Sequence, residues 1–247
     1  MTIRYQSIIG GTEAVLYDDF DIQVMHHIVP QIMGHYHNSL LTHDDGIEYL
    51  AEYYGISEHD IVTHRLGSSV RDVHGKLFKG SKSDDRILRN SLARLSVYKH
   101  TGGEVFRGCV TVPIEQDGDI VGVYGERIKR QRRGALKSYW ACMQAPCWFE
   151  LGPLQENGHA WLVSNPLYAI SSSHYLQGRI IASGGLHYIT VYDCEYLAKK
   201  GVKIITFLLL RHDMEPAYLG VVTKKLKVVG IKVSSICTSG GSHVGTA

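Results

Sequence analysis

The C-terminal third of the chain alternates apolar segments with amphipathic ones, and this pattern constrains the fold more than any other feature. Short apolar segments predict four strands, at 160–163, 179–182, 202–210 and 231–237. Between them, apolar residues at three-to-four spacing predict three helices, at 167–176, 190–200 and 216–229. Such alternation is typical of a mostly parallel sheet with helices on both faces. We therefore expect an α/β fold, with 202–210 as a buried central strand.

The region before residue 150 combines helices with one β-hairpin. Residues 42–54 predict a helix that stops at Gly55, and Ser57 caps a second helix up to residue 66. This pair is either a DNA-reading helix-turn-helix or a plain αα-hairpin, and its second helix offers only His64 and Arg65 to a groove. A third helix is expected at 84–95, with Ile87 and Leu92 facing inward and Arg94 outward. Strands at 109–114 and 120–124, joined by an Asp-Gly turn, predict the hairpin.

Residues 1–41 form an extension to which the sequence assigns no structure. It holds an acidic cluster followed by four histidines: His26, His27, His35 and His37. These histidines are either metal ligands or ordinary surface and capping residues, and their spacing fits no standard zinc finger. We divide the remainder into a mixed α+β subdomain at 42–150 and a second domain at 151–247.

Composition narrows the class of protein. The five cysteines include no CxxC pair, so we expect free thiols rather than disulfides or structural zinc. No apolar run approaches the roughly 18 residues that a membrane span needs. The first residues lack the layout of a secretion signal, so we expect a cytoplasmic protein without a membrane partner.

Positive charge is concentrated in one short segment, although the formal net charge is only +2. Residues 127–133 hold five cations in seven positions, and Lys137 follows shortly after. This run is either a solvated face or a contact for an anionic partner, and nearby aromatic residues such as Tyr139 and Trp140 favour a nucleic acid.

The hairpin region resembles the polymerase core of bacterial and phage DNA primases. The match covers Phe-Arg-Gly-Cys at 106–109, Pro113-Ile114, both glycines of the second strand and the terminal Arg127. Upstream, the Tyr-Leu pair at 49–50, Gly55 and the Leu-Gly pair at 66–67 are similar to another segment of that family. The resemblance extends over about residues 42–240 and implies a Toprim fold in the C-terminal part. The family's zinc-binding domain is not expected in this chain.

A Toprim site holds Mg²⁺ on a glutamate after one strand and on an Asp-x-Asp motif after another. The resemblance places Ser164 at the glutamate position and Tyr168 at a later acidic position. The Asp-x-Asp positions fall on Leu210 or Arg211 and on His212 or Asp213, with Glu215 close by. Because these side chains offer few carboxylates, we expect at most weak Mg²⁺ binding, no metal or other cofactor, and no nucleotidyl transfer.

Three functions stay open at this point. The first is a primase-like protein with a degenerate Toprim site that assists DNA replication of a phage or mobile element. It would bind single-stranded DNA or a primer–template, and a replication protein is a further candidate partner. The second is a catalytically silent Toprim module that docks on replication or defence machinery, and the third is an active primase with an unrecognised metal site. For the first function, the expected contacts are Arg107, Arg127, Lys129, Arg130, Arg132, Arg133 and Lys137.

Overall fold

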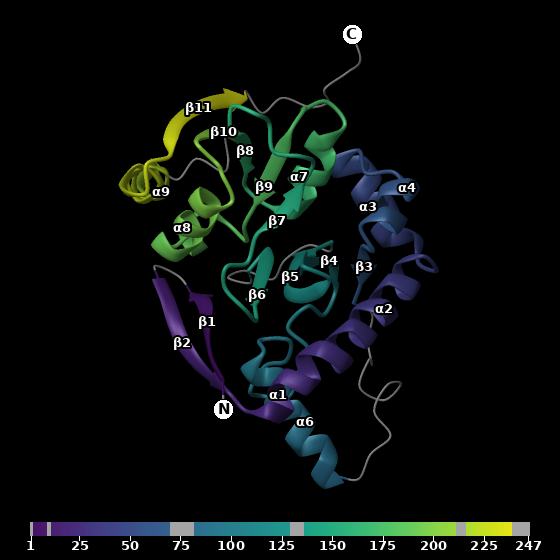
Figure 1. Cartoon of the computed structure of the whole chain (residues 1–247). Coiled ribbons are helices and arrows are strands. Elements are labelled where there is room, and N and C mark those ends of the chain that lie inside the picture. Colours follow the sequence, from purple (N-terminus) through teal and green to yellow (C-terminus); the bar gives the residue numbers. More distant parts are fainter. Residues whose placement is uncertain (1, 9–10, 70–81, 129–135, 211–215, 239–247) are drawn as a thin grey trace. The chain divides into compact units, whose positions relative to one another are not determined.

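The computed structural model describes residues 2–8, 11–69, 82–128, 136–210 and 216–238, and its chain divides into two compact units. The first unit consists of residues 2–8 and 12–147, and the second mainly of residues 148–238. Figure 1 labels their helices and strands. Both units combine helices with sheets, which confirms the predicted α/β class.

The first unit begins with a two-stranded sheet, β1 (Thr2–Ile8) and β2 (Gly11–Tyr17). A helical run follows without interruption: α1 (Asp19–Gln23), the π-helix η1 (Val24–Ile28) and α2 (Val29–Leu40). Its apolar side packs with α6 (Lys82–Arg94) and with one face of a sheet, and Ile32, Leu92 and Val123 are fully buried there. The extension that the sequence left unassigned therefore contributes to the core of this unit.

The predicted helix pair is present as α3 (Asp44–Tyr54) and the short α4 (Glu58–Thr63). Gly55 ends α3 in the left-handed conformation, and Ser57 caps α4 through a capping box with Asp60. In α6 the predicted helix is correct, but two orientations differ: Ile87 is 54% exposed, and Arg94 binds Asp21. Periodicity gives the faces of a helix, but it does not reveal what packs against each face.

A four-stranded antiparallel sheet carries the predicted hairpin. Its order is β3 (Gly67–Ser68), β4 (Cys109–Gln116), β5 (Asp119–Arg127) and β6 (Ser138–Cys142). The turn between β4 and β5 consists of Asp117 and Gly118, both with positive φ, as expected for Asp-Gly chemistry. Side chains alternate between the two faces of a strand. Val123 therefore faces the core with α2 and α6, whereas Tyr124 and Glu126 both lie on the opposite face of the sheet.

The second unit is the alternating fold that the sequence predicted. Its sheet has the order β11 (Lys232–Thr238), β10 (Ile204–Leu210), β8 (His159–Val163), β9 (Arg179–Ala182) and β7 (Phe149–Leu151). All neighbours are parallel except β7 and β9. The apolar segment at 202–210 forms an interior strand, β10, between β11 and β8, although the middle strand of the five is β8.

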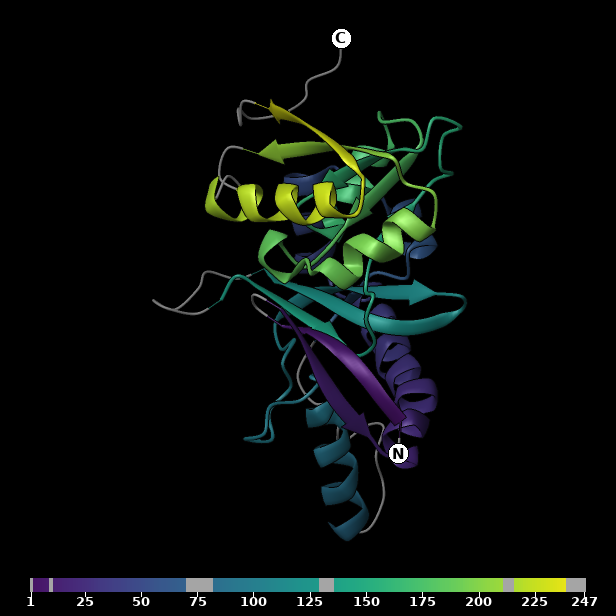
Figure 2. The ribbon, with the colours of Figure 1, turned by 60° about the vertical axis from the view of Figure 1, so that its left-hand side comes forward.

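Helices cover both faces of this sheet. On one face, α8 (Val191–Lys199) and α9 (Pro216–Val228) lie side by side, as Figure 2 shows, and bury Cys194, Leu226 and Phe207 together. The turn η2 (Leu186–Tyr188) adds Leu186 to that core. The helix α7 (Pro166–Ser173) packs against the sheet outside this cluster, next to β7 and β9. Among the described residues, no helix combines the length and apolar character that a membrane crossing requires.

Candidate functional site

Three of the predicted nucleic-acid contacts lie at one end of the β4–β5–β6 sheet. Cys109, which starts β4, pairs with Arg127 at the end of β5, and Arg107 directly precedes β4. The amide of Arg127 donates to the carbonyl of Lys137 over 2.9 Å, so the connection from β5 to β6 is closed at this point. We call Lys99, Arg107, Arg127 and Lys137 the cationic end of the sheet.

Lys99 belongs to the cationic end although the sequence did not single it out. Its charge, like that of Arg127, acts on the thiol of Cys109. Burial raises the pKa of Cys109 to about 12, and these two cations only partly oppose that effect. Lys99 and Arg107 are both exposed. Both lie in the connection between α6 and β4, and that shared segment is the signal that would have identified Lys99.

The basic run itself spans the β5–β6 connection. Lys129, Arg130, Arg132 and Arg133 lie outside the described residues, so their positions are not assigned. What the structure does place is the two anchors of the run, because Ile128 bonds to Gly108 and Lys137 bonds to Arg127. Of the predicted cations, the described ones, Arg107, Arg127 and Lys137, are thus brought to one end of one sheet.

Arg127 is held by its neighbours. Its Nε and Nη2 donate to the hydroxyl of Tyr139 over 3.1 and 2.7 Å, and Nη1 donates to the carbonyl of Arg107 over 3.3 Å. The hydrogen bond to Tyr139 is the main reason why the pKa of Arg127 is raised. A fixed guanidinium at this position presents its charge without paying further side-chain entropy on binding.

A buried carboxylate lies beside the cationic end, and the sequence analysis missed it. Glu126 is 2% exposed and accepts hydrogen bonds from the hydroxyls of Tyr54 and Tyr124, each over 2.7 Å, and from Tyr49. Lys137 Nζ lies 3.2 Å from its Oε1. Burial, together with the charge of Glu126, raises the pKa of Tyr54 and Tyr124, so both remain protonated donors. The available signal was a glutamate in an otherwise largely apolar strand, two positions after Tyr124 and therefore on the same side of that strand.

The Toprim-like edge of the second unit carries no carboxylate among its described residues. Ser164 follows β8, and its Oγ is buried with no hydrogen-bond partner in the described part of the chain. Asn165 caps α7 by accepting from the amide of Tyr168 over 3.0 Å. Leu210 ends the neighbouring strand β10, whereas Arg211, Asp213 and Glu215 lie outside the described residues. Within the described ranges, no group of three His, Cys, Asp or Glu residues is arranged to hold a metal ion.

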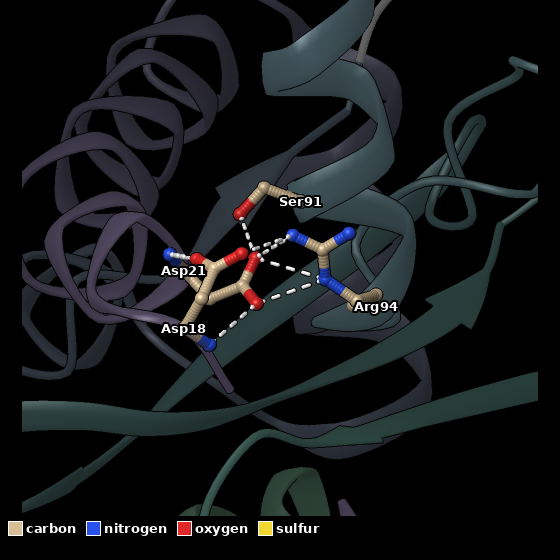
Figure 3. A network of polar contacts seen from close by, with 4 residues as sticks. All are labelled: Asp18, Asp21, Ser91 and Arg94. Carbon is tan, nitrogen blue, oxygen red and sulfur yellow. Dashed lines mark hydrogen bonds and ion pairs between the residues drawn. The ribbon is translucent and has the colours of Figure 1, made fainter. Parts of the chain in front are cut away.

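Two of the N-terminal histidines, and Asp21 of the acidic cluster, contact other segments of the first unit. His37 Nδ1 lies 2.8 Å from the carbonyl of Leu66, and His26 Nδ1 lies 3.1 Å from Asp119. Figure 3 shows the acidic cluster, in which Asp21 accepts from Ser91 and from two nitrogens of Arg94. Burial of Asp21 opposes its charged form, but hydrogen bonds from Arg94 and Ser91 outweigh this and lower its pKa. The network joins α1 to α6.

Solved structures with the same arrangement of elements exist. A DnaG catalytic core superposes with a TM-score of 0.68 at 16% identity, and the match covers 90% of this chain and 73% of that one. The fold is that of a primase catalytic core. A DnaG catalytic domain bound to single-stranded DNA is similar, with a TM-score of 0.66, 15% identity and coverage of 90% and 73%. The resemblance seen in the sequence is thus confirmed for the fold.

A structure of the Aquifex aeolicus primase that contains its zinc-binding and RNA polymerase domains is also similar over part of its length. That TM-score is 0.62 at 18% identity, and the match covers 92% of this chain but 57% of the Aquifex chain. This chain therefore spans somewhat more than half of that protein. No protein-family model matches the sequence, and no curated protein is similar to it at a significant level.

Proposed function

We propose that this chain binds single-stranded DNA or a primer–template through Arg107, Arg127 and the basic run that follows Arg127 in the sequence. In this proposal it is an accessory factor in the replication of a phage or mobile element, acting in the cytoplasm. The observation that carries the proposal is the position of Arg107 and Arg127 at one end of one sheet, directly beside the point where the basic run leaves β5, in a primase-like fold. Such cations hold the phosphate backbone, so binding is weakly sequence-selective.

The basic run is tested by replacing Arg130, Arg132 and Arg133 together with alanine. On single strands each phosphate contact contributes about 0.7 to the magnitude of the log–log salt slope, so the triple variant flattens the slope by about two units. Affinity falls to a similar degree for unrelated sequences, because the lost contacts read no bases. Fluorescence anisotropy with labelled oligonucleotides over a salt series measures both effects.

A matched control removes the same charge elsewhere. Lys199, Lys200 and Lys203 are exposed in the second unit, and their joint replacement by alanine leaves the salt slope unchanged. If both triple variants flatten the slope equally, binding reflects overall charge rather than the basic run.

We further propose that nucleotidyl transfer has been lost. Ser164 and Tyr168 cannot ligate Mg²⁺ as carboxylates do, and the buried Ser164 hydroxyl offers one neutral oxygen at the position of the family's glutamate. Purified protein therefore makes no primer on a single-stranded template with either Mg²⁺ or Mn²⁺. Primer synthesis that Asp213→Ala abolishes would instead identify an active primase with an unrecognised metal site.

A second candidate is a protein-docking module built on the same degenerate fold. It is favoured by exposed apolar side chains on α9, where Val221 is 46% and Val228 79% exposed. The salt dependence of binding distinguishes the two candidate functions. Nucleic-acid binding releases counterions, so its affinity falls steeply as the ionic strength rises.

A further inference from the structure

Glu126 is one of the buried carboxylates of the first unit. A carboxylate that is 2% exposed is costly unless donors surround it, and the hydroxyls of Tyr49, Tyr54 and Tyr124 provide them. Tyr49 and Tyr54 come from α3, whereas Tyr124 lies two residues earlier on β5. Donors from two elements hold the carboxylate in place.

Lys137 is the exposed member of the pair. Its side chain is 60% exposed, and its Nζ lies 3.2 Å from a carboxylate oxygen that cannot move away. Exposed ion pairs commonly contribute little, partly because both long side chains must be ordered. Here Glu126 is already ordered by the tyrosines, so only Lys137 loses freedom when the pair forms.

The position of Lys137 gives this pair a consequence for binding. Lys137 ends the connection that carries the basic run, and its carbonyl accepts from the amide of Arg127. A phosphate that approaches Lys137 also meets the negative charge of Glu126, so the two charges largely cancel at that distance. Arg107 and Arg127 have no carboxylate within ion-pair distance among the described residues.

We propose that Glu126 is a positioning residue that binds Lys137, fixes the end of the basic run and removes this cation from phosphate binding. The inference rests on the proposed function and refines it. The sequence counted Lys137 with the other cations, whereas the geometry leaves Arg107 and Arg127 as the described cations that face a phosphate without a paired carboxylate.

The test compares salt slopes for a fluorescently labelled oligodeoxythymidine, using the full chain. Glu126→Gln keeps the shape and an oxygen that accepts from the tyrosines but removes the charge. It therefore frees Lys137, tightens binding at low salt and steepens the slope by about 0.7. Lys137→Met leaves the wild-type slope unchanged, and the double variant returns to the slope of Lys137→Met.

A matched control removes a paired carboxylate from the same hairpin. Glu115 on β4 forms an ion pair with Arg65, and Glu115→Gln changes the net charge by the same amount as Glu126→Gln. The control leaves the slope unchanged. An equal steepening in both variants would overturn the proposal, because the effect would then follow total charge.

Because Lys137 is exposed, the Lys137→Met variant tests whether Lys137 binds phosphate even if Glu126→Gln fails to fold. A slope flattened by about 0.7 in Lys137→Met shows that Lys137 binds phosphate, and this overturns the inference while leaving the proposed function intact. Wild-type protein that binds no oligonucleotide at low salt overturns both, so the two failures are distinguishable.

Discussion

At the scale of single residues, the network around Asp21 makes the first unit sensitive to one arginine. Asp21 is fully buried, and Arg94 supplies the charge that compensates it. Arg94→Ala leaves a buried carboxylate without its cation, and we expect a loss of about 2–3 kcal/mol in the free energy of unfolding. Urea unfolding measures this loss. Arg86→Ala, which changes an exposed arginine on the same helix, is the control and has little effect.

The same network predicts a pH dependence. The pKa of Asp21 lies below its ordinary value of 3.8 in the folded chain, so the unfolded chain takes up the proton first. The stabilisation is therefore complete above that value and is lost as the pH falls through the folded pKa. Accordingly, the stability difference between wild type and Arg94→Ala narrows below pH 3.8. A difference that stays constant over that range would contradict the assignment.

At the scale of elements, the hairpin glycines that carry the primase resemblance have a packing role. A Cβ on Gly122 would lie 2.8 Å from the carbonyl oxygen of Ala141 on β6 and would also meet Cys147. A Cβ on Gly125 would enter the ring of Phe106. Gly122→Ala therefore forces β5 and β6 apart and costs about 1–3 kcal/mol, measured by thermal unfolding. Gly34→Ala is the control, because beyond the adjacent backbone of its own helix an added Cβ would have no described atom within 4 Å.

The helices and strands that were predicted correctly are those whose sequence signals act over a few neighbouring residues. The hairpin, α3, α4 and the alternation of the second unit were predicted because capping, turn chemistry and periodicity act within a few residues. The run α1–η1–α2 was missed because its apolar side becomes recognisable only against α6 and the sheet. Arg94 was placed in solvent for the same reason, since its partner Asp21 lies 73 positions away.

At the scale of the whole molecule, the sequence identified the positive charge of the candidate site. It did not show that Glu126 neutralises one of these charges, that of Lys137. Arg107, Arg127 and the basic run were visible as a composition bias. Glu126 was not visible as part of the site, because its partner Tyr49 is 77 positions distant and meets it only in the fold. The Toprim-like positions Arg211, Asp213 and Glu215 remain predictions, as they lie outside the described residues.

The central claim is that this primase-like chain binds a phosphate backbone through its basic run. The most direct measurement is the affinity of the wild-type protein for a labelled single-stranded oligonucleotide as a function of salt concentration. With about six cations contributing about 0.7 each, we expect a linear log–log plot with a slope near −4. Absence of binding at low salt, or binding that does not change with salt, would contradict it.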